Sequence, residues 1–320
     1  MFNGLYHSII GASHTAKGTV CQDWSAFQAN DNYAIAVVAD GHGSKKHFRS
    51  DIGSKLAVAA TLDAVHDFYA DVDLFEKCLV SAPKVIIRKL EKNIISRWNT
   101  AVKLHFDAHP VTEEEKSPFT EEEFTAIRRE SIYGTTLIAC ILGREFTFGI
   151  QIGDGSLVVL DEDCEADMPI IEDDSTPANL TASMCNSGAI DLFNSFFMPD
   201  KALAVFCSTD GLYTSFRSTE DFLDYHTIIA SHLDKASAFD MVVKRNLAKR
   251  THFGTQDDIS LSVAFDQEQL LADVPKLKEQ VERNKFRAEI RKAEHKAKIE
   301  KQRMKNIMRQ RAIGGDDDEE

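Results

Sequence analysis

The sequence predicts an α+β fold in which antiparallel β-sheets and a separate group of helices form distinct layers. Three features of the pattern lead to this prediction. Apolar residues recur at helical spacing over one long stretch, they alternate with polar residues further along, and the alternating segments follow one another across short turns. A βαβ array would instead place a helix between consecutive strands.

The helical stretch comes after a short strand. Residues 33–39 form a β-branched and alanine-rich run that ends at Asp40, and they predict a buried strand leading into a loop. Beyond the loop, apolar residues at four-residue spacing predict an amphipathic helix that ends near Tyr69. These residues are Ile52, Leu56, Ala60 and Ala64. A second helical stretch is predicted over about residues 73–105.

The pattern changes after residues 109–123, where two prolines and six glutamates predict a loop with a new helix starting near Thr120. Residues 135–142 and 145–152 are rich in β-forming residues, and Gly143–Arg144 between them suits a hairpin turn. Further strands are predicted at residues 157–160, 202–207 and 259–265.

Charge is distributed unevenly along the chain. The net charge is −14, residues 276–311 carry +9 from 14 Lys and Arg against 5 Asp and Glu, and residues 316–320 add five acids, so residues 1–275 carry about −18. This acidic body disfavours a broad nucleic-acid surface, because phosphate contacts need clustered cations. Acidic residues can also gather metal ions.

The cysteines and the hydropathy pattern bear on location. The six cysteines include no CxxC pair, which indicates reduced core residues of a cytoplasmic protein. Residues 1–14 lack the pattern of a secretory signal, and no run approaches the roughly 18 apolar residues of a membrane span. We therefore expect a cytoplasmic location and no membrane span.

Aspartates stand at the ends of the predicted strands. Asp40, Asp154 and Asp210 each follow a strand and precede a glycine, whereas Asp257 stands just before the strand at 259–265. Any single Asp-Gly pair is most often a turn. An antiparallel sandwich, however, can bring such strand ends together at one edge. Carboxylate oxygens suit Mg²⁺ and Mn²⁺, and the His and Cys cluster that zinc prefers is missing from the pattern.

Six short motifs resemble, in sequence order, those of the type 2C protein phosphatases, the metal-dependent serine/threonine phosphatase family, and most closely its bacterial branch. They are CQD at 21–23, VADGHG at 38–43, GTT at 134–136, IGDGS at 152–156, STDGL at 208–212 and GTQDDIS at 254–260. The resemblance implies a four-layer α-β-β-α sandwich of two packed antiparallel sheets flanked by helices. It places the phosphatase domain at residues 1–268, followed by a basic helical extension with an acidic tail at 269–320.

The resemblance also implies a centre of two Mn²⁺ or Mg²⁺ ions, with a third ion at a weaker site. Asp40 would bridge the two ions, and the backbone carbonyl of Gly41 would bind one of them. Asp210 and Asp257 would complete the shell of the other ion.

Three further residues receive roles from the same resemblance. Asp23 would act on the second ion through water, and Asp154 would bind the third ion. His42 occupies a position proposed as the general acid for the departing alkoxide. The alternative for His42 is a loop residue that orients Asp40.

Two positions depart from the family pattern. Gln22 stands where the family often has a glutamate, so one outer carboxylate is missing. Gly18 stands where many animal members have an arginine that grips phosphate. Lys17 is adjacent and could bind substrate in its place, with a solvated lysine as the alternative.

The function expected from these residues is the hydrolysis of phosphoserine and phosphothreonine in proteins by a metal-activated water. One alternative is a metal-dependent hydrolase of nucleotides or other small phosphate esters. Another is a catalytically silent module that binds phosphoproteins. The family further implies an opposing serine/threonine kinase.

The C-terminal segment at residues 276–311 predicts a helix, because it is rich in helix formers and mixes opposite charges at three- and four-residue spacing. Its apolar residues are too sparse for a sustained heptad seam. It could be solvated or disordered, bind a protein partner, fold back on the acidic body, or contact RNA or anionic lipid. Residues 160–198 lie where the family carries a flap beside the active site, and their acidic stretch at 161–174 could tune substrate choice or be a solvated loop.

Overall fold

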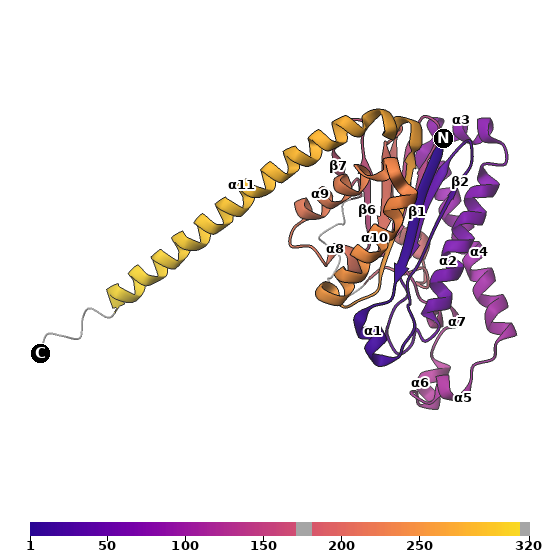
Figure 1. The fold of residues 1–320 in the computed structure, drawn as a ribbon. Coiled ribbons are helices and arrows are strands. Elements are labelled where there is room, and N and C mark those ends of the chain that lie inside the picture. Colours follow the sequence, from indigo (N-terminus) through magenta and orange to yellow (C-terminus); the bar gives the residue numbers. More distant parts are fainter. Residues whose placement is uncertain (171–180, 314–320) are drawn as a thin grey trace, which may run out of the picture.

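Two five-stranded antiparallel sheets pack face to face in the computed structural model, which describes residues 1–170 and 181–313, with side chains up to Asn306 (Figure 1). In order across the first sheet, the strands are β1 (Phe2–Ile9), β10 (Ile259–Asp266), β9 (Ala204–Ser208), β6 (Ser156–Leu160) and β7 (Ala166–Asp167). Across the second sheet they are β2 (Trp24–Ala29), β3 (Ala34–Ala39), β4 (Leu137–Leu142), β5 (Thr147–Ile152) and β8 (Asn194–Met198). The predicted sandwich is confirmed.

The central strands are apolar throughout because both of their faces are buried. In β3, Ala34, Ala36 and Val38 face the other sheet and pack with residues such as Val205. The alternate residues of the same strand, Ile35, Val37 and Ala39, face the helices that cover the second sheet. A strand that lacks a solvent face reads as a continuous apolar run, which explains the uninterrupted pattern at 33–39.

Helices α2 (Ser50–Phe68), α3 (Val72–Ser81) and α4 (Pro83–Ala108) cover the second sheet. The helical stretch predicted over about 73–105 is confirmed, and the chain divides it into two helices. Pro83 lacks a backbone N–H and disfavours a helical residue before it, so it ends the continuity and starts α4 at its first position. Trp98 of α4 is fully buried and donates from Nε1 to the Gly53 carbonyl of α2 at 3.1 Å.

The segment between α4 and β4 holds three short helices, α5 (Glu113–Lys116), α6 (Glu121–Thr125) and α7 (Arg129–Ile132). Thr112 and Thr120 cap α5 and α6, each accepting a hydrogen bond from the backbone N–H three residues on. The helix start predicted near Thr120 is therefore confirmed.

The first sheet is covered by α9 (Thr219–Ala230), α10 (Ala236–Arg250) and the first part of α11 (Gln267–Ile313). Shorter elements are α1 (Ala12–Lys17), α8 (Asp210–Tyr213), the 3₁₀ turns η1 (Ala189–Leu192) and η2 (Leu233–Lys235), and the π-helical turn η3 (Thr251–Thr255). The sequence patterns did not predict β1, β2, β8, α9 or α10.

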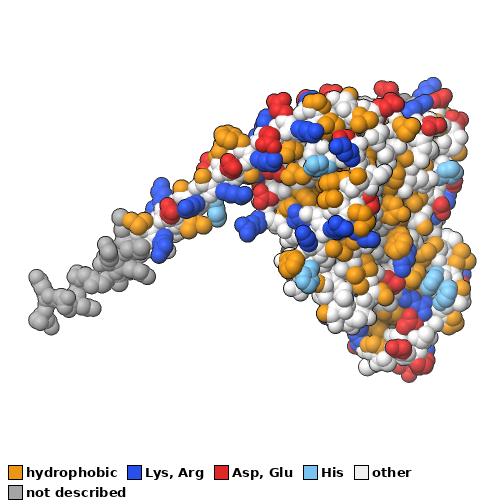
Figure 2. All heavy atoms as spheres, viewed as in Figure 1, with side chains coloured by type: hydrophobic (Ala, Val, Ile, Leu, Met, Phe, Trp, Pro, Cys, Tyr) orange, Lys and Arg blue, Asp and Glu red, His pale blue; other side chains and the backbone are white. Residues whose placement is uncertain are grey.

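Helix α11 begins in the core and then leaves the body (Figure 1). Leu270 and Leu277 are buried against the first sheet and its helices, and Val281 is also buried. Farther along, Arg291 donates to Asp224 of α9 at 2.9 Å. Lys and Arg side chains lie along the projecting part (Figure 2).

The predicted helix at 276–311 is thus confirmed, and its basic side chains Lys276 and Arg291 form ion pairs with Asp163, Asp221 and Asp224 of the body. The predicted acidic tail at 316–320 and part of the acidic stretch at 161–174 lie outside the described residues. In the portions of the chain that the structure describes, no helix has both the length and the apolar character needed to cross a bilayer.

Candidate metal centre

Asp40 directly follows β3, and hydrogen bonds fix both its backbone N–H and its backbone carbonyl. Its N–H donates to Thr136 Oγ1 at 3.0 Å, and its carbonyl accepts from Thr136 N at 2.8 Å and from Thr135 Oγ1 at 2.9 Å. The next residue, Gly41, donates to the Gln22 carbonyl at 3.1 Å. A Cβ at Gly41 would lie 2.6 Å from the Gln22 carbonyl oxygen, so this close approach requires glycine.

The predicted aspartates line two cavities that share residues. Asp40, Asp154, Asp210 and Asp257 line a cavity of about 430 Å³. Asp40 and Asp257 also line a second cavity of about 250 Å³, together with Asp23 and Gly41. Every metal-binding residue predicted from the sequence therefore lies at one of these two cavities, and Asp40 lies at both.

The carboxylates of this cluster repel one another. Burial raises the pKa of Asp40 well above its usual range, and the charges of Asp23 and Asp210 raise it further. Burial likewise raises the pKa of Asp23, although Thr209 Oγ1 donates to that carboxylate at 2.7 Å and acts in the opposite direction. The pKa of Asp210 is raised by burial and by Asp154. Bound cations would relieve this repulsion.

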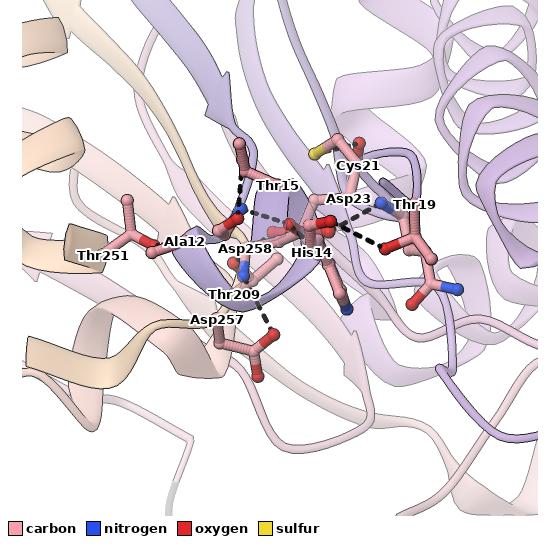
Figure 3. Close-up of polar contacts among 12 residues, drawn as sticks. Ala12, His14, Thr15, Thr19, Cys21, Asp23, Thr209, Thr251, Asp257 and Asp258 are labelled. Carbon is pink, nitrogen blue, oxygen red and sulfur yellow. Dashed lines mark hydrogen bonds and ion pairs between the residues drawn. The ribbon is translucent and has the colours of Figure 1, made fainter. Parts of the chain in front are cut away.

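Asp258 holds the N-terminal segment against the centre (Figure 3). Its Oδ1 accepts from Gly11 N at 2.6 Å and from His14 Nδ1 at 2.9 Å, and its Oδ2 accepts from Gln22 N at 2.7 Å. Only 4% of the side chain is exposed. The sequence reasoning assigned Asp258 no role, although its place directly before a buried strand was a usable signal.

His42 faces the larger cavity beside Asp40. Its backbone N–H donates to the Gly134 carbonyl at 3.1 Å, and its ring centroid lies 5.0 Å from the ring centroid of His47. A Cβ at Gly134 would lie 2.4 Å from His47 Nδ1 and 3.0 Å from His42 Cδ2, so glycine leaves room for both rings. Burial and His47 lower the pKa of His42 to about 4, which leaves the ring uncharged at neutral pH.

Arg49, at the start of α2, joins the loop after Asp40 to the segment that carries α5. Its guanidinium donates to Glu115 through Nε at 2.7 Å and through Nη2 at 2.8 Å. It also donates to the Tyr133 hydroxyl at 3.0 Å. This buried fork contributes to fixing the loop at residues 41–49.

The structure does not bring Lys17 to the centre. Lys17 is exposed at the end of α1 and lines neither cavity. Lys46 lines the larger cavity instead, and its charge contributes to lowering the pKa of His42. Sequence reasoning missed Lys46, although the pair Lys45–Lys46 follows the DGHG motif closely.

The donor chemistry of the centre fits Mg²⁺ or Mn²⁺. In the described ranges, 1–170 and 181–313, no three His, Cys, Asp or Glu side chains are arranged as a closed metal-ligand group. Mg²⁺ nevertheless keeps several waters and usually takes only one or two protein carboxylates. Aspartate oxygens spread around a polar cavity meet that requirement, so the residues fit these ions.

Comparison with known proteins identifies the family. The family model described as Protein phosphatase 2C matches residues 10–250. The chain therefore belongs to the protein phosphatase 2C family, whose members are metal-dependent serine/threonine phosphatases, and it is an enzyme of that class. The resemblance predicted from the six motifs is confirmed. No curated protein sequence matches the chain significantly.

Several solved structures share the fold at low sequence identity. PppA, a key regulatory component of T6SS in Pseudomonas aeruginosa, is 16% identical with a TM-score of 0.51, covering 82% of this chain and 97% of that one. A bacterial serine phosphatase is 13% identical with a TM-score of 0.51, covering 83% and 98%. The S. agalactiae serine/threonine phosphatase is 13% identical with a TM-score of 0.51, covering 83% and 99%. These likenesses support the fold alone.

Proposed function

We propose that the chain hydrolyses phosphoserine and phosphothreonine in proteins by attack of a metal-activated water. The observation that carries the proposal is the convergence of Asp23, Asp40, Asp154, Asp210 and Asp257, from five separate segments, around two joined cavities. Bound there, two Mn²⁺ or Mg²⁺ ions would lower the pKa of a shared water and neutralise charge on the phosphoryl oxygens.

The division of residues between the cavities parallels the roles expected from the family. Asp40 lines both cavities, as a bridging ligand should, and Asp257 lines both as well. Asp210 and Asp154 line only the larger cavity, whereas Gly41 and Asp23 line only the smaller one. We assign Asp210 and Asp257 to one ion, the Gly41 carbonyl and Asp23 to the second, and Asp154 to a third.

His42 is the proposed general acid. It lines the same cavity as Asp40. An uncharged ring at neutral pH equally suits the alternative, in which His42 holds the loop that positions Asp40. The leaving-group experiment in the Discussion separates the two roles.

Hydrolysis of small phosphate esters or nucleotides is the alternative function, because the same chemistry would serve it. A silent binding module is disfavoured, since the chain retains each expected aspartate. An opposing kinase, a protein partner for the basic part of α11 and a cytoplasmic location are further proposals, which follow from the family and from the sequence.

The test uses the full chain on a phosphothreonine peptide and on a nucleotide panel. We expect turnover with Mn²⁺, loss of turnover with EDTA, and a fall in kcat/KM of about a thousandfold in Asp40→Asn. Asp31→Asn, an exposed aspartate in the turn between β2 and β3, is the matched control and should behave as wild type. Turnover that survives EDTA or Asp40→Asn contradicts the proposal, and faster turnover of nucleotides than of peptide favours the alternative.

Metal binding can be measured without activity. Mn²⁺ at one hundred times its Kd should raise the free energy of unfolding by about 2.7 kcal/mol. The increase should appear in wild type and Asp31→Asn and be much smaller in Asp40→Asn. An equal increase in all three proteins would place the ion elsewhere.

A further inference from the structure

The lining of the larger cavity includes a positively charged side chain, Lys46, that the family pattern does not predict. The position of the phosphate-gripping arginine is Gly18 here, and neither Gly18 nor Lys17 lines the cavity. Lys46 does line it, in the company of Asp40, Asp154, Asp210 and Asp257.

We propose that Lys46 binds the phosphoryl group of the substrate, and that its ammonium group and the side-chain amide of Asn186 form a phosphate subsite beside the carboxylate cluster. The inference rests on the proposed function for its substrate class. It assigns to Lys46 and Asn186 the phosphate-binding role of the arginine that Gly18 replaces.

The side chains of the adjacent residues Lys45 and Lys46 have different surroundings. Lys45 Nζ lies 3.7 Å from Glu123 and 4.5 Å from the ring centroid of Phe119, so the side chain of Lys45 is occupied by the segment that carries α6. Among the described residues, Lys46 has no such carboxylate partner, although four aspartates line its cavity. Lys46 thus adds a positive charge to the lining of the cavity that would receive the phosphoryl group.

The backbone around Lys46 is held in place. His47 N donates to the Ser44 carbonyl at 2.8 Å, which closes a turn around Lys45 and Lys46. Arg49 N donates to the Ile132 carbonyl at 3.1 Å, just beyond the turn. Because the backbone is already fixed, only side-chain entropy is lost when Lys46 orders on a ligand.

Asn186 reaches the same cavity from a second segment. Its Oδ1 accepts from Ser183 N at 2.7 Å, which orients the side chain and leaves the NH₂ group to donate. Ser183 Oγ and Met184 N both donate to the Thr135 carbonyl, at 3.1 and 2.9 Å. The turn that carries Asn186 is therefore hydrogen-bonded to Thr135, whose side chain also donates to the Asp40 carbonyl.

The chemistry of a phosphomonoester calls for such groups. A phosphoryl group carries close to two negative charges at neutral pH, and it would enter a cavity lined by aspartates. Bound cations offset part of that repulsion, and a lysine adds a charge-assisted hydrogen bond as a point charge. Because these contacts would go to the phosphoryl oxygens, they should matter equally for a phosphopeptide and for free phosphate.

The experiment compares Lys46→Gln with Lys45→Gln, the neighbouring lysine that faces away. We measure KM and kcat on a phosphothreonine peptide, the Ki of inorganic phosphate, and the Kd of inorganic phosphate for the Mn²⁺-loaded full chain by calorimetry. Lys46→Gln should raise KM, Ki and Kd about tenfold, which corresponds to about 1.4 kcal/mol, and change kcat by less than about twofold. Lys46→Arg should restore most of the affinity, and Lys45→Gln should match wild type.

The outcomes separate the subsite from the proposed function. If wild type turns over the peptide and Lys46→Gln binds phosphate as tightly as Lys45→Gln, the subsite is wrong and the function stands. If wild type is inactive yet Lys46→Gln weakens phosphate binding tenfold, the subsite stands without that function. A fall in kcat or in Mn²⁺ affinity with unchanged phosphate affinity would show that Lys46 acts on the metal centre, and it overturns the inference.

Discussion

His226, which lies in the helices that cover the first sheet, makes the free energy of unfolding depend on pH. His226 of α9 is fully buried, its Nδ1 donates to the Phe222 carbonyl at 2.7 Å, and its Nε2 has no hydrogen-bond partner among the residues that the structure describes. The rings of Phe206 and Phe222 lie 4.9 and 4.4 Å away. Burial lowers the pKa of His226 to about 4, and the positive charge of Arg250 acts in the same direction.

The magnitude follows from the difference between the folded and unfolded protein. The unfolded chain binds a proton at this histidine near pH 6.5, whereas the folded protein resists protonation until about pH 4. The free energy of unfolding is therefore largest above pH 6.5 and falls as the pH drops toward 4. The shift corresponds to about 3.4 kcal/mol in total, of which about 2 kcal/mol should be lost between pH 7 and pH 5.

Urea unfolding in EDTA, followed through the fluorescence of buried Trp98, measures this loss at pH 7, 6 and 5. Replacing His226 with Phe removes the titrating group and keeps an apolar ring among aromatic neighbours. The decrease in unfolding free energy between pH 7 and pH 5 should become about 2 kcal/mol smaller than in wild type. His66→Phe, at an exposed position of α2, is the control and should keep the wild-type dependence.

A second replacement, His226→Leu, protects the result against a packing defect specific to phenylalanine. Both variants should show the shallower pH dependence whatever their stability at pH 7. If wild type and both variants lose the same free energy between pH 7 and pH 5, His226 does not titrate as its burial requires, and the reasoning is refuted.

Two further predictions concern the catalytic loop and the C-terminal helix. If His42 is a general acid, His42→Ala should lower kcat on phosphothreonine peptide by about a hundredfold or more and affect p-nitrophenyl phosphate far less, because nitrophenolate needs no proton to leave; equal losses on both substrates favour the positioning role. Deleting residues 292–320 should leave kcat/KM and its salt dependence unchanged. Within the described residues, the Lys and Arg side chains of α11 that pair with the rest of the chain reach Asp163, Asp221 and Asp224 and not the carboxylate cluster. A changed salt dependence would indicate docking near the centre.

The central strands and the carboxylate set were predictable from the sequence. Strands such as β3 and β4 are buried on both faces, so their apolar character is visible without knowing their neighbours. Asp40, Asp154 and Asp210 each follow such a strand, and the fold brings them to the lining of one cavity. The prediction of a metal centre needed only the order of these short motifs.

The edge strands were not predictable in the same way. β1, β2 and β8 are mostly half-buried, and Trp24 at the start of β2 is 42% exposed. Their apolar residues do not alternate cleanly, because each of these strands has less covering on one side than the central strands have. Which of their residues are buried depends on how the two sheets and their helices pack, and the sequence of each strand alone does not show it.

The sequence by itself determined which aspartates stand at strand ends and the class of chemistry, since both depend on residue types in short motifs. Only the tertiary structure decided which of two adjacent lysines faces the cavity, that Asp258 ties residues 11–22 to the centre, and that Arg49 joins the loop to Glu115. The physical reason is that each of these outcomes depends on contacts between segments far apart in the chain. The charges, hydrogen bonds and burial that set them arise only when those segments meet.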